Sequence, residues 1–260
     1  MKLLKSILIV TCMLFASLAI AESTPATTNG FTTEQQTQIK QIIHDYLVQN
    51  PGVLIEASKA LQAQTMQKMQ AQGIKGAKEN ADELFRSSTS PVAGNAKGNI
   101  TMVTFLDYQC PYCRTMTTTV DALMKANPNL RVVFKEFPVH GDDSVLAAKA
   151  ALAANLQGKY WELHQALMTT KNTINEATAI ELAKNLGLDT KKLQADMKTD
   201  AISKEISATY PLAKNLALVG TPAFIVAETD TKADSTATIG YFPGGTSQQD
   251  LQAAIDKLKK

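Results

Sequence analysis

The amino-acid sequence predicts an α/β domain that contains a helical insertion and follows an α-helical N-terminal arm. Runs of β-branched and aromatic residues, typical of buried strands, occur only after about residue 99. A long block of helical periodicity separates the first two of these runs from the last two. The chain has 260 residues, 45% of them hydrophobic, which is enough for one sizeable core and a smaller appendage.

The first 21 residues have the features of an export signal. Lys2 and Lys5 precede an apolar run from Ile7 to Ile20, and Ala19-Ile20-Ala21 is a cleavage site of the small-x-small type. An uncleaved membrane anchor is the alternative, but the run is shorter than the ~20 residues that span a bilayer. We expect cleavage near Ala21, loss of Cys12, and localisation in the periplasm or outside the cell, with outer-membrane or surface association left open.

The charge of the chain argues against one class of partner. Lysine and arginine number 26 and aspartate and glutamate 24, and the two excess positive charges are accounted for by Lys2 and Lys5 in the signal. The mature chain is therefore neutral, and we expect no nucleic-acid partner.

Residues 22–32 read as a flexible leader and residues 33–86 as a helical arm. One helix begins at Thr33 and is interrupted by Pro51 and Gly52; a second covers about 53–72 and is expected to end at Gly73 and Gly76. Their apolar faces are too narrow to form a core of their own. We expect residues 33–75 to join subunits in a homo-oligomer, the alternative being packing on the rest of the chain.

Residues 87–98 are rich in Ser, Gly and Pro and read as a linker into a main domain at 99–260. Helical patterns fill an insertion at about 143–218, and an amphipathic helix at 246–260 closes the chain. The expected strands cover residues 100–108, 131–138, 223–227 and 236–242.

The segment Cys110-Pro111-Tyr112-Cys113 lies where the first strand gives way to a helix. Cys110 then falls near the N-cap and Pro111 at the first helical position, which proline favours. Free backbone N–H groups and the helix dipole stabilise a thiolate at Cys110. Cys113, one turn later, is expected to be more buried and to act as the resolving thiol.

Two other uses of the cysteine pair fit the sequence less well. A structural zinc site needs four ligands, and the remaining candidates, His44, His140 and His164, are scattered over different segments. A structural disulfide would close so short a loop that it would add little stability. The pair is therefore interpreted as a redox couple that needs no metal and no other cofactor.

The motifs "FLDYQCPYC" and "VGTPAF", with the strand order and helical insertion, resemble the DsbA-type branch of the thioredoxin superfamily over about 99–260. The resemblance implies a thioredoxin fold, Cys110 as the nucleophile and Cys113 as its partner in a redox-active disulfide. It also implies that Pro222 is a cis-proline and that the backbone of Thr221 pairs with the substrate. The arm segment "IIHDYLVQNPGVLIEA" is similar to the arms of oligomeric exported ScsC-like and Com1-like proteins.

One position departs from the family pattern. DsbA-type oxidases often have a buried acidic residue six positions before the first cysteine, where this chain has Thr104. Asp107, Lys135 and Glu136 are nearby alternatives in sequence, although each is more often an ordinary surface or strand-end charge. His164 is expected to be a packing or surface residue, and His140 is a candidate for the face of the site.

These observations predict an exported thiol–disulfide oxidoreductase that acts on cysteine-containing exported proteins. Threonine before the cis-proline is shared by the isomerases and reductases of the family, which favours isomerase or mixed activity over a dedicated oxidase. A membrane redox partner of DsbB or DsbD type would set the direction of electron flow. The alternative is a non-catalytic periplasmic chaperone or metal-binding protein.

Overall fold

The computed structural model describes residues 30–233 and 236–259. The predicted signal peptide, residues 1–21, and leader residues 22–29 lie outside this part of the chain. The structure divides into two units, Met1–Leu61 and Gln62–Lys260. The boundaries predicted for the arm, linker and main domain remain predictions.

The described part of the first unit contains helix α1 and the beginning of helix α2, which continues into the second unit. Helix α1 spans Thr33–Gln49 and begins at a capping box, in which the Thr32 hydroxyl accepts from the backbone N–H of Gln35 and the Gln35 side chain accepts from the backbone N–H of Thr32. Helix α2 spans Gly52–Glu79. No side chain of α1 is buried. Among the described residues, no helix combines the length and apolar character needed to cross a bilayer.

The expected end of the second helix at Gly73 and Gly76 is wrong, because α2 continues to Glu79. Both glycines lie where the helix approaches other segments closely. A Cβ atom at Gly73 would lie 2.1 Å from the ring of Tyr241, and one at Gly76 would lie 2.2 Å from the backbone oxygen of Asn215. Here glycine serves close packing, and it does not break the helix.

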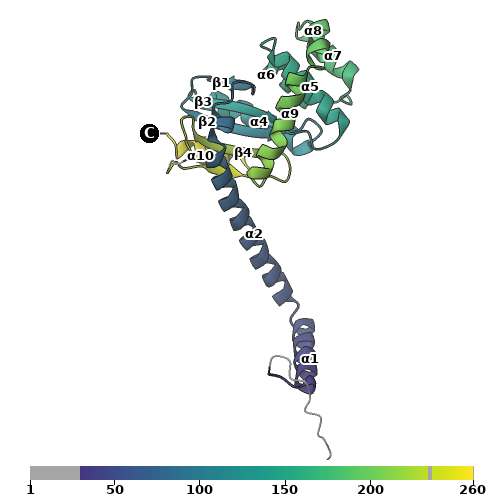
Figure 1. The fold of residues 1–260 in the computed structure, drawn as a ribbon, viewed down its shortest axis with the longest axis vertical. Coiled ribbons are helices and arrows are strands. Elements are labelled where there is room, and N and C mark those ends of the chain that lie inside the picture. Colours follow the sequence, from purple (N-terminus) through teal and green to yellow (C-terminus); the bar gives the residue numbers. More distant parts are fainter. Residues whose placement is uncertain (1–29, 234–235, 260) are drawn as a thin grey trace, which may run out of the picture. The chain divides into compact units, whose positions relative to one another are not determined.

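A mixed sheet of five strands forms the centre of the second unit (Figure 1). The strand order is β1-β3-β2-β4-β5, with β2 and β3 parallel and the other pairs antiparallel. Strands β2 and β3 are fully buried, as expected for the centre of a covered sheet. The strands are β1 Val92–Gly94, β2 Ile100–Leu106, β3 Leu130–Glu136, β4 Ala223–Glu228 and β5 Gly240–Phe242.

Two strands differ from the sequence prediction. Strand β1 lies within the segment interpreted as a linker, where it adds an antiparallel edge to β3. The last strand was expected over 236–242, but its ladder with β4 includes only Gly240–Phe242. Both strands have three residues, too few to give a clear alternating pattern.

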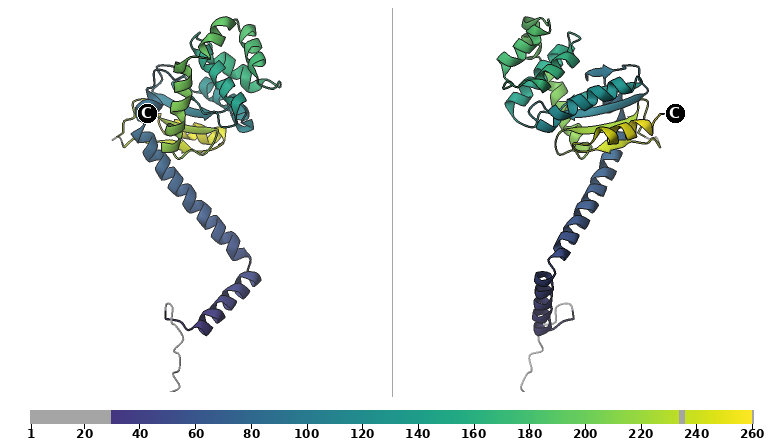
Figure 2. Two further views of the ribbon diagram at one scale, coloured as in Figure 1. Left: turned by 45° about the vertical axis from the view of Figure 1, so that its right-hand side comes forward. Right: turned by 180° about the vertical axis from the view of Figure 1, so that it is seen from behind.

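Helices cover both faces of the sheet (Figure 2). One core cluster joins α4 and α10 with the insertion, and the other contains side chains of α3, α9 and the opposite sheet face. The insertion, α5 to α9, lies between β3 and β4 and confirms the expected helical block. The remaining helices are α3 Ala81–Phe85, α4 Pro111–Ala126, α5 Asp142–Asn155, α6 Tyr160–Thr169, α7 Glu176–Asn185, α8 Thr190–Asp196, α9 Asp200–Asn215 and α10 Gln248–Asp256. The prediction of an α/β fold with a helical insertion is confirmed.

Candidate active site

The two thiols lie at the start of α4, directly after β2. Cys110 is the N-cap residue of α4 and Pro111 occupies its first turn. The backbone N–H of Cys110 donates to the carbonyl oxygen of Asp107, at 3.2 Å, which closes the turn between strand and helix. Both cysteines are free thiols. Tyr112, between them, is 72% exposed.

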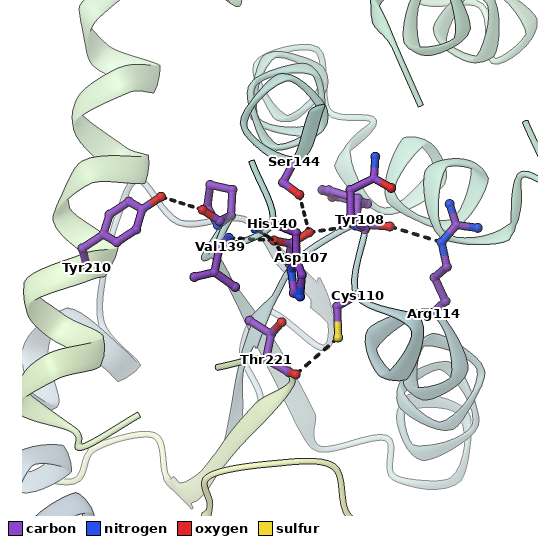
Figure 3. A network of polar contacts seen from close by, with 11 residues as sticks. Asp107, Tyr108, Cys110, Arg114, Val139, His140, Ser144, Tyr210 and Thr221 are labelled. Carbon is purple, nitrogen blue, oxygen red and sulfur yellow. Dashed lines mark hydrogen bonds and ion pairs between the residues drawn. The ribbon is translucent and has the colours of Figure 1, made fainter. Parts of the chain in front are cut away.

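Cys113 is not the more buried of the two thiols, because each cysteine is only 3% exposed. The segment before β4 covers Cys110, whose Sγ donates to the carbonyl oxygen of Thr221 at 3.3 Å (Figure 3). Burial raises the pKa of Cys113 far above its ordinary value. The buried Cys113 thiol therefore keeps its proton unless another group accepts it.

The Thr221–Pro222 peptide bond is cis, and it lies immediately before β4. Pro222 and Cys113 line a common cavity of about 10 Å³, which has room for about one water molecule. Thr104, the residue at the position of the family's acidic group, lines the same cavity. The structure thus brings together all six predicted site residues, Cys110 to Cys113 and Thr221 to Pro222.

Asp107 fixes the turn that carries Cys110. Its carboxylate is fully buried and accepts hydrogen bonds from the Ser144 hydroxyl, at 2.7 Å, and from the Gln109 N–H, also at 2.7 Å (Figure 3). The backbone N–H groups of Val139 and His140 also donate to it, as does the His140 ring at 2.9 Å. Burial alone would raise the pKa of Asp107, but these hydrogen bonds outweigh it and lower the pKa.

A second buried polar cluster surrounds Glu136, at the end of β3. One of its carboxyl oxygens accepts from the hydroxyls of Tyr160, at 2.7 Å, and Tyr108, at 3.0 Å. The Tyr108 hydroxyl also lies 3.1 Å from Nδ1 of His164. Burial raises the pKa of Glu136 to about 8 and lowers that of His164 to about 3.

The sequence identified Glu136 and His164 but not the cluster that they form. Tyr160 and His164 come from α6 in the insertion, and nothing in local sequence pairs them with β3. Lys135 lies apart from this cluster and pairs with Glu83 at 2.6 Å. His164 is buried, and its ring stacks on those of Trp161 and Tyr160.

Arg114 is a further residue that sequence reasoning missed. Its Nε donates to the carbonyl oxygen of Tyr108, at 3.1 Å (Figure 3). Its Nη1 donates to the carbonyl oxygen of Thr170, at 2.7 Å, at the end of α6. One side chain therefore joins the first turn of α4 to the insertion. Among the described residues, no three His, Cys, Asp or Glu side chains are grouped so that they could hold a metal ion.

Two family models match the chain. Residues 101–256 match the DSBA-like thioredoxin domain, and residues 35–68 match the copper resistance protein ScsC N-terminal domain. Among solved structures, Salmonella enterica Typhimurium BcfH is 31% identical, with a TM-score of 0.69 over 87% of this chain and 97% of that one. A thioredoxin-like oxidoreductase from Silicibacter pomeroyi is 41% identical, with a TM-score of 0.61 over 68% of this chain and 95% of that one.

The chain also matches part of several longer curated relatives, which are Na(+)/H(+) antiporters. The chain is 28% identical, over 162 residues, to the Na(+)/H(+) antiporter NhaA 3 of Salinispora tropica. The match covers 60% of this chain but only a quarter of that protein's length. The family model, by contrast, covers more than half of this chain and includes the cysteine pair and Pro222. The chain therefore belongs to the DSBA-like thioredoxin domain family.

Proposed function

We propose that this protein is an exported thiol–disulfide oxidoreductase that acts on cysteine-containing exported proteins. The observation that carries the proposal is the Cys110 thiol at the start of α4, 3.3 Å from the Thr221 carbonyl beside a cis-proline. The N-terminus of a helix favours a thiolate, the reactive form in disulfide exchange. Export rests on the signal sequence at residues 1–21.

Exchange proceeds in two steps at the sulfur atoms. The Cys110 thiolate attacks one sulfur of a substrate disulfide, forms a mixed disulfide and releases the other substrate sulfur as a thiolate. Cys113 then attacks Cys110, which releases the second substrate thiolate and leaves a Cys110–Cys113 disulfide. The substrate gains two electrons and the protein loses two; run in reverse, the same steps oxidise a substrate dithiol.

The surface around the thiols suits an extended polypeptide. The backbone of Thr221 is suited to pair with a substrate chain alongside Cys110. Three apolar side chains near these residues in sequence or structure are exposed: Tyr112 at 72%, Val219 at 85% and Val139 at 42%. Such side chains contact unfolded chains with little regard to sequence, as a general folding catalyst requires.

The direction of the reaction is proposed to be isomerisation or mixed exchange. Thr221 before Pro222 favours this over dedicated oxidation, and a membrane partner of DsbB or DsbD type would keep the thiols in the required state. A homo-oligomer joined through residues 33–75 would bring several thiol pairs to one substrate. Support for that assembly comes from the exposed apolar side chains of the arm.

The test compares the mature wild-type protein with Cys110→Ala and Cys113→Ala in insulin reduction and in refolding of scrambled ribonuclease. Cys110→Ala should lose both activities, because no nucleophile remains. Cys113→Ala should instead accumulate mixed disulfides that it cannot resolve. Equal activities of wild type and Cys110→Ala would refute the proposal, and suppression of aggregation that persisted in Cys110→Ala would favour a non-catalytic chaperone.

A further inference from the structure

The resolving thiol lacks an obvious base. Cys113 is buried, and burial raises its pKa, so the thiol is protonated. Because only the thiolate attacks a disulfide, Cys113 must lose this proton before it can attack the mixed disulfide. Thr104, which lines the cavity beside Cys113, has a hydroxyl that cannot accept a proton near neutral pH. Some other group must therefore receive this proton.

His164 connects the thiol cavity to the Glu136 cluster. Its ring lines the same cavity of about 10 Å³ as the Cys113 side chain. Its Nδ1 lies 3.1 Å from the Tyr108 hydroxyl. The buried carboxylate of Glu136 is therefore linked to the cavity through Tyr108 and His164.

The hydrogen bonds fix the direction in which each group donates. The Tyr108 hydroxyl donates to Glu136, so its oxygen is the acceptor for His164. His164 must then hold its proton on Nδ1, which leaves Nε2 as an acceptor. A proton taken up at Nε2 can be passed on from Nδ1 to Tyr108, and from Tyr108 to Glu136.

We propose that Glu136 receives the Cys113 proton, through His164 and Tyr108, as Cys113 attacks the mixed disulfide. The inference rests on the proposed function. The Cys113 S–H proton moves to His164 Nε2, the Nδ1 proton moves to the Tyr108 oxygen, and the Tyr108 proton moves to Glu136. At the end His164 and Tyr108 are neutral and Glu136 is protonated. The Cys113 sulfur has formed its bond to Cys110, and the bond between Cys110 and the substrate sulfur has broken, so that the substrate leaves as a thiolate.

The surroundings of Glu136 suit this role. No described donor reaches its second carboxyl oxygen, so the buried carboxylate is incompletely stabilised and accepts a proton readily. Its pKa is raised to about 8, first by burial and then by the charge of Asp107, while the Tyr160 and Tyr108 hydrogen bonds oppose the rise. The titratable groups around this path are Asp107 and Tyr108 after β2, Tyr160 and His164 on α6, and Cys113 on α4.

The experiment follows the reduced full-length mature protein mixed with dithiobis-nitrobenzoate, which releases a coloured thiolate at each step. The first release reports attack by Cys110, and its rate depends on reagent concentration. The second reports attack by Cys113 within the mixed disulfide, and its rate does not. Stopped-flow traces across a pH series separate the two.

In the wild type, the rate of the second release should rise with pH through a midpoint at about 8, since only the ionised Glu136 accepts a proton. Glu136→Gln should lose this inflection and slow the second release about 100-fold at pH 8, with the first release unchanged. Tyr108→Phe should do the same, because it removes the middle hydroxyl of the path. If Glu136→Gln does not fold, the rate and pH profile of the second release in Tyr108→Phe test the relay instead.

Two matched controls separate the relay from simple structural damage. Tyr160→Phe removes the other hydrogen bond to Glu136, which is not on the path, so the inflection should remain and move to higher pH. Glu181→Gln removes an exposed carboxylate on α7 and should behave as wild type. A normal first release with a wild-type pH profile for the second release in Glu136→Gln would overturn the relay. Absence of the first release in wild type would instead overturn the proposed function.

Discussion

Asp107 shows how a single residue can organise the candidate active site. Its backbone carbonyl accepts from Cys110, while its buried carboxylate accepts from the loop after β3 and from α5. The turn that carries the thiol is thereby tied to a loop more than 30 positions later in the chain. The sequence offered Asp107 only as one nearby charge, because its partners are distant in sequence.

Replacement of Asp107 by Asn should destabilise the protein. The amide retains one acceptor oxygen and presents an NH₂ group to donors at the other, so we expect a loss of about 2 kcal/mol in the free energy of unfolding at pH 7. Because folding lowers the pKa of Asp107 below the ordinary 3.8, its stabilisation is present above that pH and disappears as pH falls through the folded pKa. Urea unfolding at pH 7 and in acid measures both effects.

The control for this variant is Asp121→Asn, which removes a carboxylate from a surface pair with Lys125. Such pairs contribute at most about 0.5 kcal/mol. Similar losses for the two variants would contradict the role assigned to Asp107.

The candidate site was predictable to different degrees. Cys110 and Pro111 follow local rules of helix capping, whereas the cis bond at Pro222 was implied by the family resemblance that the motif "VGTPAF" carries. The cluster of Glu136, Tyr160 and His164 could not be predicted, because its members meet only after the insertion packs on the sheet. The burial of Cys110 was missed because Thr221, which contacts its sulfur, lies 111 positions later in the chain.

At the scale of elements, the C-terminal end of α2 depends on two glycines. Gly76 lies against the backbone of Asn215, at the end of α9, and the side chain of Ala77 beside it is fully buried. A glycine inside a helix normally indicates weakness or an end, and this general rule led to the wrong boundary. Strand β1 was missed because three residues at an edge carry almost no periodic signal.

Gly76→Ala should destabilise the fold although alanine favours helix. The new Cβ would lie 2.2 Å from a backbone oxygen that cannot rotate away, and the overpacking should cost about 1–3 kcal/mol. Gly52→Ala is the matched control, since nothing lies within 4 Å of its Cβ position. It should be neutral or slightly stabilising. Equal unfolding midpoints in urea for the two variants would show that the close approach is unimportant.

At the scale of the whole molecule, the arm carries large apolar side chains that are exposed within the described part of the chain. Ile42 is 67% exposed and Tyr46 56% exposed on α1, and Leu61 is 64% exposed on α2. Exposed apolar residues that recur along a helix face are typical of a seam between subunits. The match of residues 35–68 to a named N-terminal domain agrees with a separate role for this segment.

Ile42→Asp should therefore lower the mass of the mature protein in multi-angle light scattering. A charge in the seam would be desolvated on association, so the subunits should separate while the redox domain stays folded. Gln38→Asp, on the same helix but with no apolar side chain removed, should keep the wild-type mass. If the Ile42→Asp and wild-type masses are equal, residues 33–75 do not join subunits through this face.

Arg114 joins two segments on one side of the candidate site. Its guanidinium donates to the carbonyl oxygens of Tyr108 and Thr170, and so joins the turn that carries the thiols to the end of α6. The opposite side consists of Val219, which is exposed, Gly220, which is half-buried, and Thr221. On this side the Cys110 sulfur is covered through its contact with the Thr221 carbonyl oxygen, a contact that an incoming substrate backbone can replace.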